Sequence, residues 1–115
     1  MKHLTFADKS LLVGDEVADL MIRYASMLAT AGSADAVDIH AYSSDGDEVI
    51  ATFLLNEGSP LMAETTHSRL PEPDNTDAIR HMRGQMGLLS HPPTVQPEKD
   101  DKDFPDADEL DDFRL

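Results

Sequence analysis

The chain has 115 residues, no cysteine, and a formal net charge of −14 from 23 acidic and 9 basic side chains. A chain of this length forms about one domain, and the lack of cysteine excludes disulfides and thiolate-bound zinc. The acidic balance argues against binding to nucleic-acid phosphates and favours a basic protein partner.

The N-terminal residues favour a short strand over Lys2–Phe6, with Leu4 and Phe6 on its buried face. The next apolar run, Leu11–Val13, either extends a hairpin or leads into the following helix, and the sequence leaves both alternatives open. Asp8 interrupts the N-terminus before any long apolar stretch forms, so we expect no signal peptide, no membrane span and a cytoplasmic protein.

An amphipathic helix is predicted over Asp15–Ala31, where the apolar residues recur with a period near 3.6. Gly32 follows directly and suits a left-handed helix cap. The predicted buried stripe contains seven side chains: Val17, Leu20, Met21, Tyr24, Met27, Leu28 and Ala31.

Three strands are predicted in the centre of the chain. Apolar and polar residues alternate over residues 37–42, an Asp-Gly turn dipeptide stands at 45–46, and a second apolar run covers Val49–Leu55. A second turn at 56–59 precedes a strand over residues 61–66. Because short turns join antiparallel neighbours, the three strands are expected to form a meander.

The run Val49–Leu55 is apolar on both faces apart from Thr52, which is typical of a strand that is covered on both sides. Either the two helices take opposite faces of the sheet, or one face pairs with a second protomer. Pairing of one face with a second protomer would make the protein a homodimer, and we predict this state.

A second helix is predicted over about residues 76–89, capped by Asp74 or Asn75. Gly84 and Gly87 each weaken this helix by about 1 kcal/mol relative to alanine. The helix therefore depends on packing against the rest of the domain.

The predicted fold class is α+β, with a two-layer arrangement of two helices on a three- or four-stranded antiparallel sheet in the order β-α-β-β-β-α. Residues 1–91 are expected to form a compact domain. Residues 92–115 contain prolines and dense charge, and residues 98–115 alone hold nine acids and three bases. We expect this acidic tail to be disordered.

The acidic tail also contains bulky apolar residues, which give it the composition of a segment that binds a partner. It is interpreted as a solubilising tail, as a segment that binds a partner or is recognised by a protease, or as a segment that folds onto its own domain. The candidate partner-binding residues are Phe104, Leu110, Phe113 and Leu115.

No motif in the sequence predicts a catalytic or metal centre, and no cofactor is predicted. The histidines lack the i, i+4 spacing of a helical metal site, and no G-x-S-x-G or phosphate-binding loop is present. Hydroxyl, imidazole and carboxylate groups cluster only in Glu64–Ser68, which is a weak candidate for hydrolysis because such sites are recognised by geometry.

Three functional hypotheses follow. The first is a non-enzymatic cytoplasmic adaptor, regulator or inhibitor that presents its sheet or helix face and its acidic tail to a more basic protein. The second is a small-molecule module whose ligand lies between helix and sheet near Tyr24, His40 and Arg80, with Arg69, Arg80 and Arg83 as a candidate anion-binding patch. The third is a hydrolase that uses residues 64–68.

Overall fold

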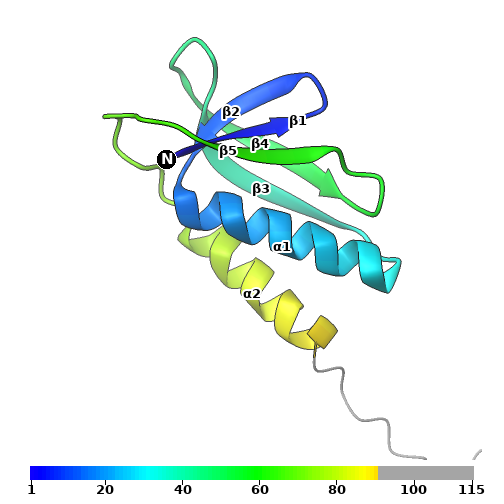
Figure 1. Ribbon diagram of the computed structural model, residues 1–115. Coiled ribbons are helices and arrows are strands. Elements are labelled where there is room, and N and C mark those ends of the chain that lie inside the picture. Colours follow the sequence, from blue (N-terminus) through cyan, green and yellow to red (C-terminus); the bar gives the residue numbers. More distant parts are fainter. Residues whose placement is uncertain (91–115) are drawn as a thin grey trace, which may run out of the picture.

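Seven helices and strands follow one another in the order β-β-α-β-β-β-α (Figure 1). The computed structural model describes residues 1–90. Their bounds are β1 Lys2–Phe6, β2 Lys9–Val13, α1 Asp15–Ala31, β3 Asp35–Tyr42, β4 Glu48–Leu55, β5 Leu61–Thr65 and α2 Thr76–Ser90.

The strands form one antiparallel sheet of five strands in the order β4-β3-β2-β1-β5. The α+β class with two helices is confirmed, but the predicted three or four strands are wrong because residues 9–13 form a strand. Phe6 pairs with Lys9 across a two-residue turn in which Ala7 has a φ of 58°. The amide of Ala7 donates to the Pro60 carbonyl, which holds the turn in this unusual conformation for a non-glycine residue.

The predicted meander is also wrong, because β5 does not pair with β4. It pairs with β1 at the opposite edge of the sheet, with Leu61 opposite Phe6 and Ala63 opposite Leu4. Only residues 56–60 separate β4 from β5 along the chain. The sheet therefore curls, and the rings of Phe6 on β1 and Phe53 on β4 meet edge to face with centroids 5.7 Å apart.

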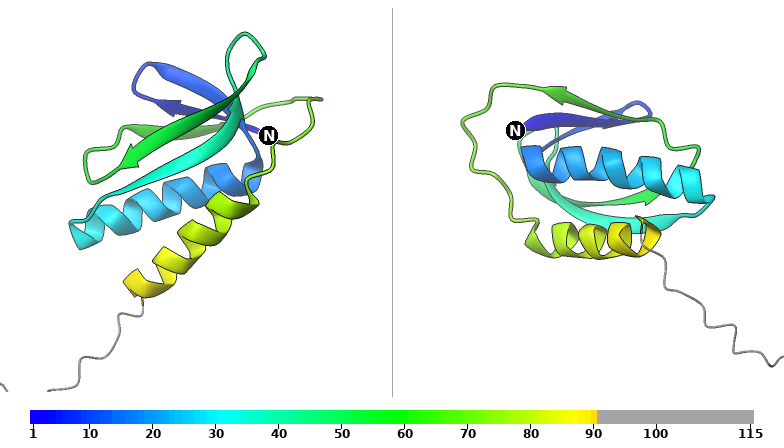
Figure 2. Two further views of the ribbon diagram at one scale, coloured as in Figure 1. Left: turned by 180° about the vertical axis from the view of Figure 1, so that it is seen from behind. Right: turned by 60° about the horizontal axis from the view of Figure 1, so that its bottom comes forward.

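The curl opens at the junction between β2 and β3. These strands share one residue pair, Leu12 with Tyr42, whereas β3 and β4 pair along eight. The β3–β4 hairpin thus diverges from the other three strands (Figure 2).

Both helices lie on the same side of the sheet, next to each other (Figures 1 and 2). Helix α1 ends at Gly32, whose φ of 65° confirms the predicted left-handed cap. The predicted stripe is largely confirmed, although Met27 is only half-buried and Ala31 is exposed. The fully buried residues with the largest side chains are Tyr24, Leu4, Met21, Ile39, Leu55, Met82, Val13 and Val17.

The outer face of β4 is exposed, so the expectation that this strand is covered on both sides is not met by residues 1–90. Ile50 and Leu54 are 64% and 58% exposed, while Phe53 and Leu55 point inward and are buried. No helix in this part of the chain has the length and apolar character needed to cross a bilayer.

Candidate functional site

The outer edge of β4 carries main-chain groups that no other strand uses. The Asn75 side chain accepts a hydrogen bond from the His40 N–H (2.8 Å) and donates one to the His40 C=O (2.9 Å), so the main-chain groups of His40 point away from β4. In an antiparallel pair, the residue opposite then also points its groups outward. Ile50 lies opposite His40 and Thr52 follows two residues later, so both direct their N–H and C=O groups to the free edge.

This edge lacks the features that usually prevent strand edges from pairing with other chains. Natural sheets protect their edges with charges, prolines, bulges or short strands. Strand β4 is eight residues long, and no charge, proline or glycine occurs from Val49 to Asn56. The other edge strand, β5, has five residues and directly follows Pro60. The edge of β4 is therefore the more open of the two.

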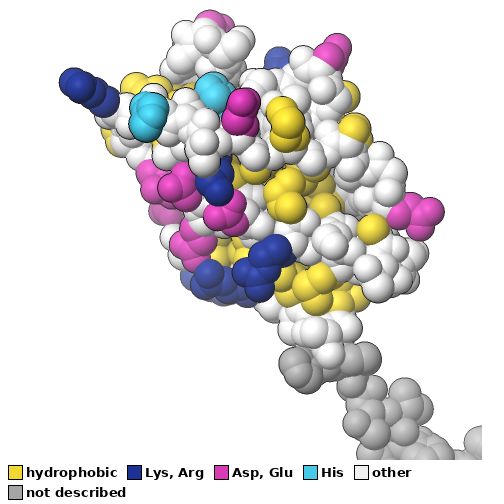
Figure 3. Space-filling model, viewed as in Figure 1, with side chains coloured by type: hydrophobic (Ala, Val, Ile, Leu, Met, Phe, Trp, Pro, Cys, Tyr) yellow, Lys and Arg dark blue, Asp and Glu magenta, His cyan; other side chains and the backbone are white. Residues whose placement is uncertain are grey.

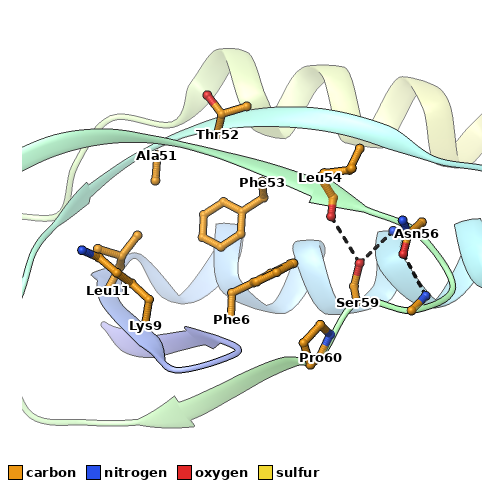
Figure 4. Close-up of a pocket in the computed structure, with 11 residues that line it drawn as sticks. Phe6, Lys9, Leu11, Ala51, Thr52, Phe53, Leu54, Asn56, Ser59 and Pro60 are labelled. Atoms are coloured by element: carbon orange, nitrogen blue, oxygen red, sulfur yellow. Dashed lines mark hydrogen bonds between the residues drawn. The ribbon is translucent and has the colours of Figure 1, made fainter.

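An apolar cavity of about 600 Å³ lies beside the edge of β4, between this strand, the β1–β2 hairpin and the turn that leads to β5 (Figure 4). Phe53 points into it, whereas Thr52 and Leu54 point away. Its volume falls in the range of about 300–1,000 Å³ that is typical of small-molecule pockets. The apolar residues that line it include Phe6, Leu11, Ala51, Phe53 and Pro60.

The polar groups around the cavity differ in how they are used. Ser59 Oγ accepts from the Asn56 N–H (2.8 Å) and donates to the Leu54 C=O (3.3 Å), so the turn at the end of β4 satisfies its own hydrogen bonds. Lys9 lines the cavity and makes no ion pair within residues 1–90. The cavity thus offers apolar contacts and one cationic group.

The charged side chains gather elsewhere, near the ends where α1 and α2 begin (Figure 3). Lys2 pairs with Asp19 (2.6 Å) and Arg83 pairs with Glu16 (2.5 Å). These exposed pairs contribute about 0–1 kcal/mol each. In each pair the two charges largely neutralise one another. Strand β4 itself carries no charged side chain after Glu48, although the Asp38 carboxylate on β3 accepts from the Thr52 hydroxyl (2.6 Å).

The predicted anion-binding patch is only partly assembled. Arg80 and Arg83 line one cavity, but Arg69 is not among its lining residues. Arg80 bonds to Asp77 and Arg83 to Glu16, so both guanidinium groups already have an acidic neighbour.

The three residues of the predicted small-molecule site do not share a cavity. His40 lines an acidic depression beside the start of α2, Arg80 lines another, and Tyr24 is buried with its hydroxyl bonded to Asp35. In the hydrolase candidate, His67 has no hydrogen bond to a hydroxyl or carboxylate in the described residues, and Ser68 Oγ accepts from the Leu70 N–H. The tail residues Phe104, Leu110, Phe113 and Leu115 lie outside the described range.

A polar cluster that the sequence did not reveal joins α1, β3 and α2, with Tyr24 buried, Asp35 partly buried and His81 exposed. Asp35 Oδ2 accepts from the Tyr24 hydroxyl (2.5 Å) and contacts His81 Nε2 at 2.7 Å. Burial alone raises the pKa of Asp35, but its hydrogen bonds with Tyr24 and His81 outweigh this effect and hold the pKa below the ordinary value. Burial, with the bond to Asp35, raises the pKa of Tyr24 far above its usual range. The three side chains bond to one another, which favours a structural role.

Replacing Asp35 with asparagine is expected to lower the free energy of unfolding at neutral pH by about 1–2 kcal/mol, because bonds to a charged acceptor are the stronger ones. A carboxyl group whose pKa is depressed by folding contributes stability above its unfolded pKa and loses this contribution as the pH falls through the folded pKa. The difference between wild type and Asp35→Asn should therefore shrink below about pH 4 in urea titrations. Asp77→Asn, on an exposed pair, is the control and should differ little from wild type at any pH. A loss for Asp35→Asn that stays constant down to acid pH would contradict the assignment.

Within residues 1–90 no group of three or more histidine and acidic side chains is placed to hold a metal ion. The sequence predicted β4 itself but not its open edge, and the lack of charge from Val49 to Asn56 was the available sign. Comparisons of the chain with protein-family profiles, curated proteins and solved structures find no match in any of the three.

Proposed function

We propose that this chain is a non-enzymatic interaction protein that binds another chain by adding a strand to the free edge of β4. The observation that carries this proposal is the free edge of β4, an eight-residue strand that has no charged side chain after Glu48 and opens onto an apolar cavity. Strand addition is a common way for a sheet to bind an extended segment, with main-chain hydrogen bonds giving affinity and side-chain pockets giving specificity.

The chemistry of the edge defines the segment that it would bind. Each main-chain hydrogen bond formed at the edge contributes about 0.5–1.5 kcal/mol to the free energy of binding. Alternate side chains of the added strand would point toward the cavity of Phe6 and Phe53, and the others would lie beside Ile50 and Leu54. The matching segment is therefore extended and apolar on both faces.

The acidic tail remains a proposed second contact. Its negative charge would attract a basic partner and speed the encounter, while the β4 edge provides the apolar contact. In this adaptor or inhibitor hypothesis the chain has two separate contacts, an electrostatic one at the acidic tail and a strand-pairing one at the edge of β4.

Ile50→Lys tests the proposal, because a lysine beside the edge opposes strand addition. Met62→Lys on β5 is the matched control, since both side chains are exposed apolar residues on edge strands, at 64% and 53%, and both variants gain the same charge. Each surface substitution should change stability by about 0.5 kcal/mol or less. The readout is affinity capture from a lysate of the source cells. Wild type and Met62→Lys are expected to retain at least one protein that Ile50→Lys does not retain. That protein can be a second copy of this chain.

Two results would contradict the proposal. One is that no chain distinguishes Ile50→Lys from Met62→Lys in quantitative capture. The other is that wild type retains nothing above an empty support. Urea unfolding of all three baits shows whether a loss of binding comes from a loss of fold.

A further inference from the structure

We infer that the chain that pairs with β4 is β4 of a second copy, in an antiparallel register centred on Thr52. The product is a two-fold dimer in which the β3–β4 hairpins of both copies form one continuous layer. This inference rests on the proposed function, because it names the partner of the same edge.

The register follows from the residues whose main-chain groups face outward. These are Ile50, Thr52 and their even-numbered neighbours in β4, as the pairing with β3 shows. The Leu54 carbonyl also accepts from Ser59 Oγ (3.3 Å), so in the dimer it accepts the partner's N–H with its second lone pair. A two-fold axis at Thr52 brings these groups together and keeps side chains of the same face opposite each other. Ile50 then lies opposite the partner's Leu54, and the same pair recurs on the other side of the axis.

The side chains fit this register on both faces. On the outer face, Ile50 and Leu54, which are largely exposed in the single chain, bury each other's apolar surface. On the inner face, Phe53 lies opposite the partner's Ala51, so a large side chain meets a small one. An axis at Ala51 would instead set the Glu48 carboxylate against the partner's Leu54, which disfavours that alternative.

The charge distribution favours a second copy over a basic partner at this edge. From Val49 to Asn56 the strand itself carries no carboxylate for a basic segment, and the neighbouring carboxylate of Asp38 on β3 already accepts from the Thr52 hydroxyl (2.6 Å). A second copy carries the same charge of −14 and is repelled by the acidic faces of the molecule. Along β4 two copies can meet without placing carboxylates directly opposite each other, since Glu48 comes opposite the partner's Asn56. The Asp38 carboxylate lies on β3, on the side of β4 away from the partner, and accepts from the Thr52 hydroxyl. Added salt screens the remaining repulsion and should strengthen the dimer.

The first measurement is the mass of the pure full-length chain by sedimentation equilibrium over a range of micromolar concentrations. The measured masses of wild type and Met62→Lys are expected to approach twice the chain mass as the concentration rises. In high salt they should reach this value at a lower concentration than in low salt. Ile50→Lys should dimerise at least about tenfold more weakly, because the axis places two copies of the substitution in the apolar strip.

The second measurement uses the absence of native cysteine. Paired residues of this kind have Cα atoms about 5.5 Å apart, within the range of about 4.4–6.8 Å that a disulfide spans. Thr52→Cys should therefore form a disulfide-linked dimer under mild oxidation, and Thr65→Cys on β5 should not. Ile50→Cys should link to Leu54→Cys in a mixture and not to itself.

A monomeric wild type at all concentrations would overturn the inference, and so would equal cross-linking of Thr52→Cys and Thr65→Cys. If the pure chain is monomeric while a lysate protein still distinguishes Ile50→Lys from Met62→Lys, the proposed function stands and the second copy is the wrong partner. If neither experiment shows binding that depends on the edge, both proposals are wrong.

Discussion

Replacing Asn75 with alanine is expected to lower the free energy of unfolding by about 2–4 kcal/mol. The Asn75 side chain is buried and bonds both main-chain groups of His40, where it takes the place of a neighbouring strand. The main-chain carbonyl of Asn75 accepts the first hydrogen bond of α2 from the Ile79 N–H. Alanine keeps this main-chain bond, but it leaves two groups of β3 without partners and removes the link between β3 and the start of α2. Urea unfolding measures the loss.

Asp74→Ala provides the matched control for this prediction. The exposed carboxylate of Asp74 bonds the amide and hydroxyl of Thr76, which is an ordinary cap at a helix start. Its loss should cost about 0.5–1 kcal/mol. Equal losses for Asn75→Ala and Asp74→Ala would show that the bonds to β3 contribute little. An intermediate loss for Asn75→Asp, which keeps the acceptor oxygen and removes the donor, would support the role of both bonds.

Asn75 also illustrates what the sequence could reveal. Its position before an apolar helical pattern identified it as a candidate cap, which is a local property. The bonds of its side chain to His40 connect residues 35 positions apart. No periodicity or spacing in the sequence encodes such a contact. The same holds for the cluster of Tyr24, Asp35 and His81, whose members come from three separate elements.

The predictions that succeeded rest on local physics. Helix α1 was predicted over its full length because its stripe repeats at the helical period and Gly32 suits a left-handed cap. The strand over residues 9–13 was left open, because the turn before it carries alanine where glycine or asparagine is usual. This turn depends on the hydrogen bond that the Ala7 N–H donates to the Pro60 carbonyl, which is distant in sequence.

The candidate site was missed for a related reason. Strand β4 is apolar on both faces, and this pattern fits a covered strand as well as an open edge. The order of strands decides between them, and the order depends on β5 pairing with β1 rather than with β4. The open edge of Ile50 and Thr52 thus follows from topology, and the homodimer predicted from the same residues remains a prediction that the mass measurement tests.

Replacing Met82 with alanine is expected to have the other large effect, a loss of about 2–5 kcal/mol in the free energy of unfolding. Met82 is fully buried on the side of α2 that packs against α1. Leu88→Ala, in the same helix at a side chain that is 53% exposed, should change stability by about 0.5 kcal/mol or less. Urea unfolding of both variants compares them directly, and a similar loss in both would contradict the packing of α2 that the structure shows.

Gly84→Ala should act in the opposite direction in the same helix. A methyl group at Gly84 meets no atom within 4 Å, so alanine gains helix propensity of about 1 kcal/mol without a clash. If α2 is held by packing at Met82 and weakened by its glycines, Gly84→Ala should recover about 1 kcal/mol of the Met82→Ala loss in the double variant. Faster amide hydrogen exchange confined to residues 76–90 in Met82→Ala, and slower exchange there in the double variant, would locate both effects in α2. Uniformly faster exchange over the sheet would instead show that the helix and the sheet unfold as one unit.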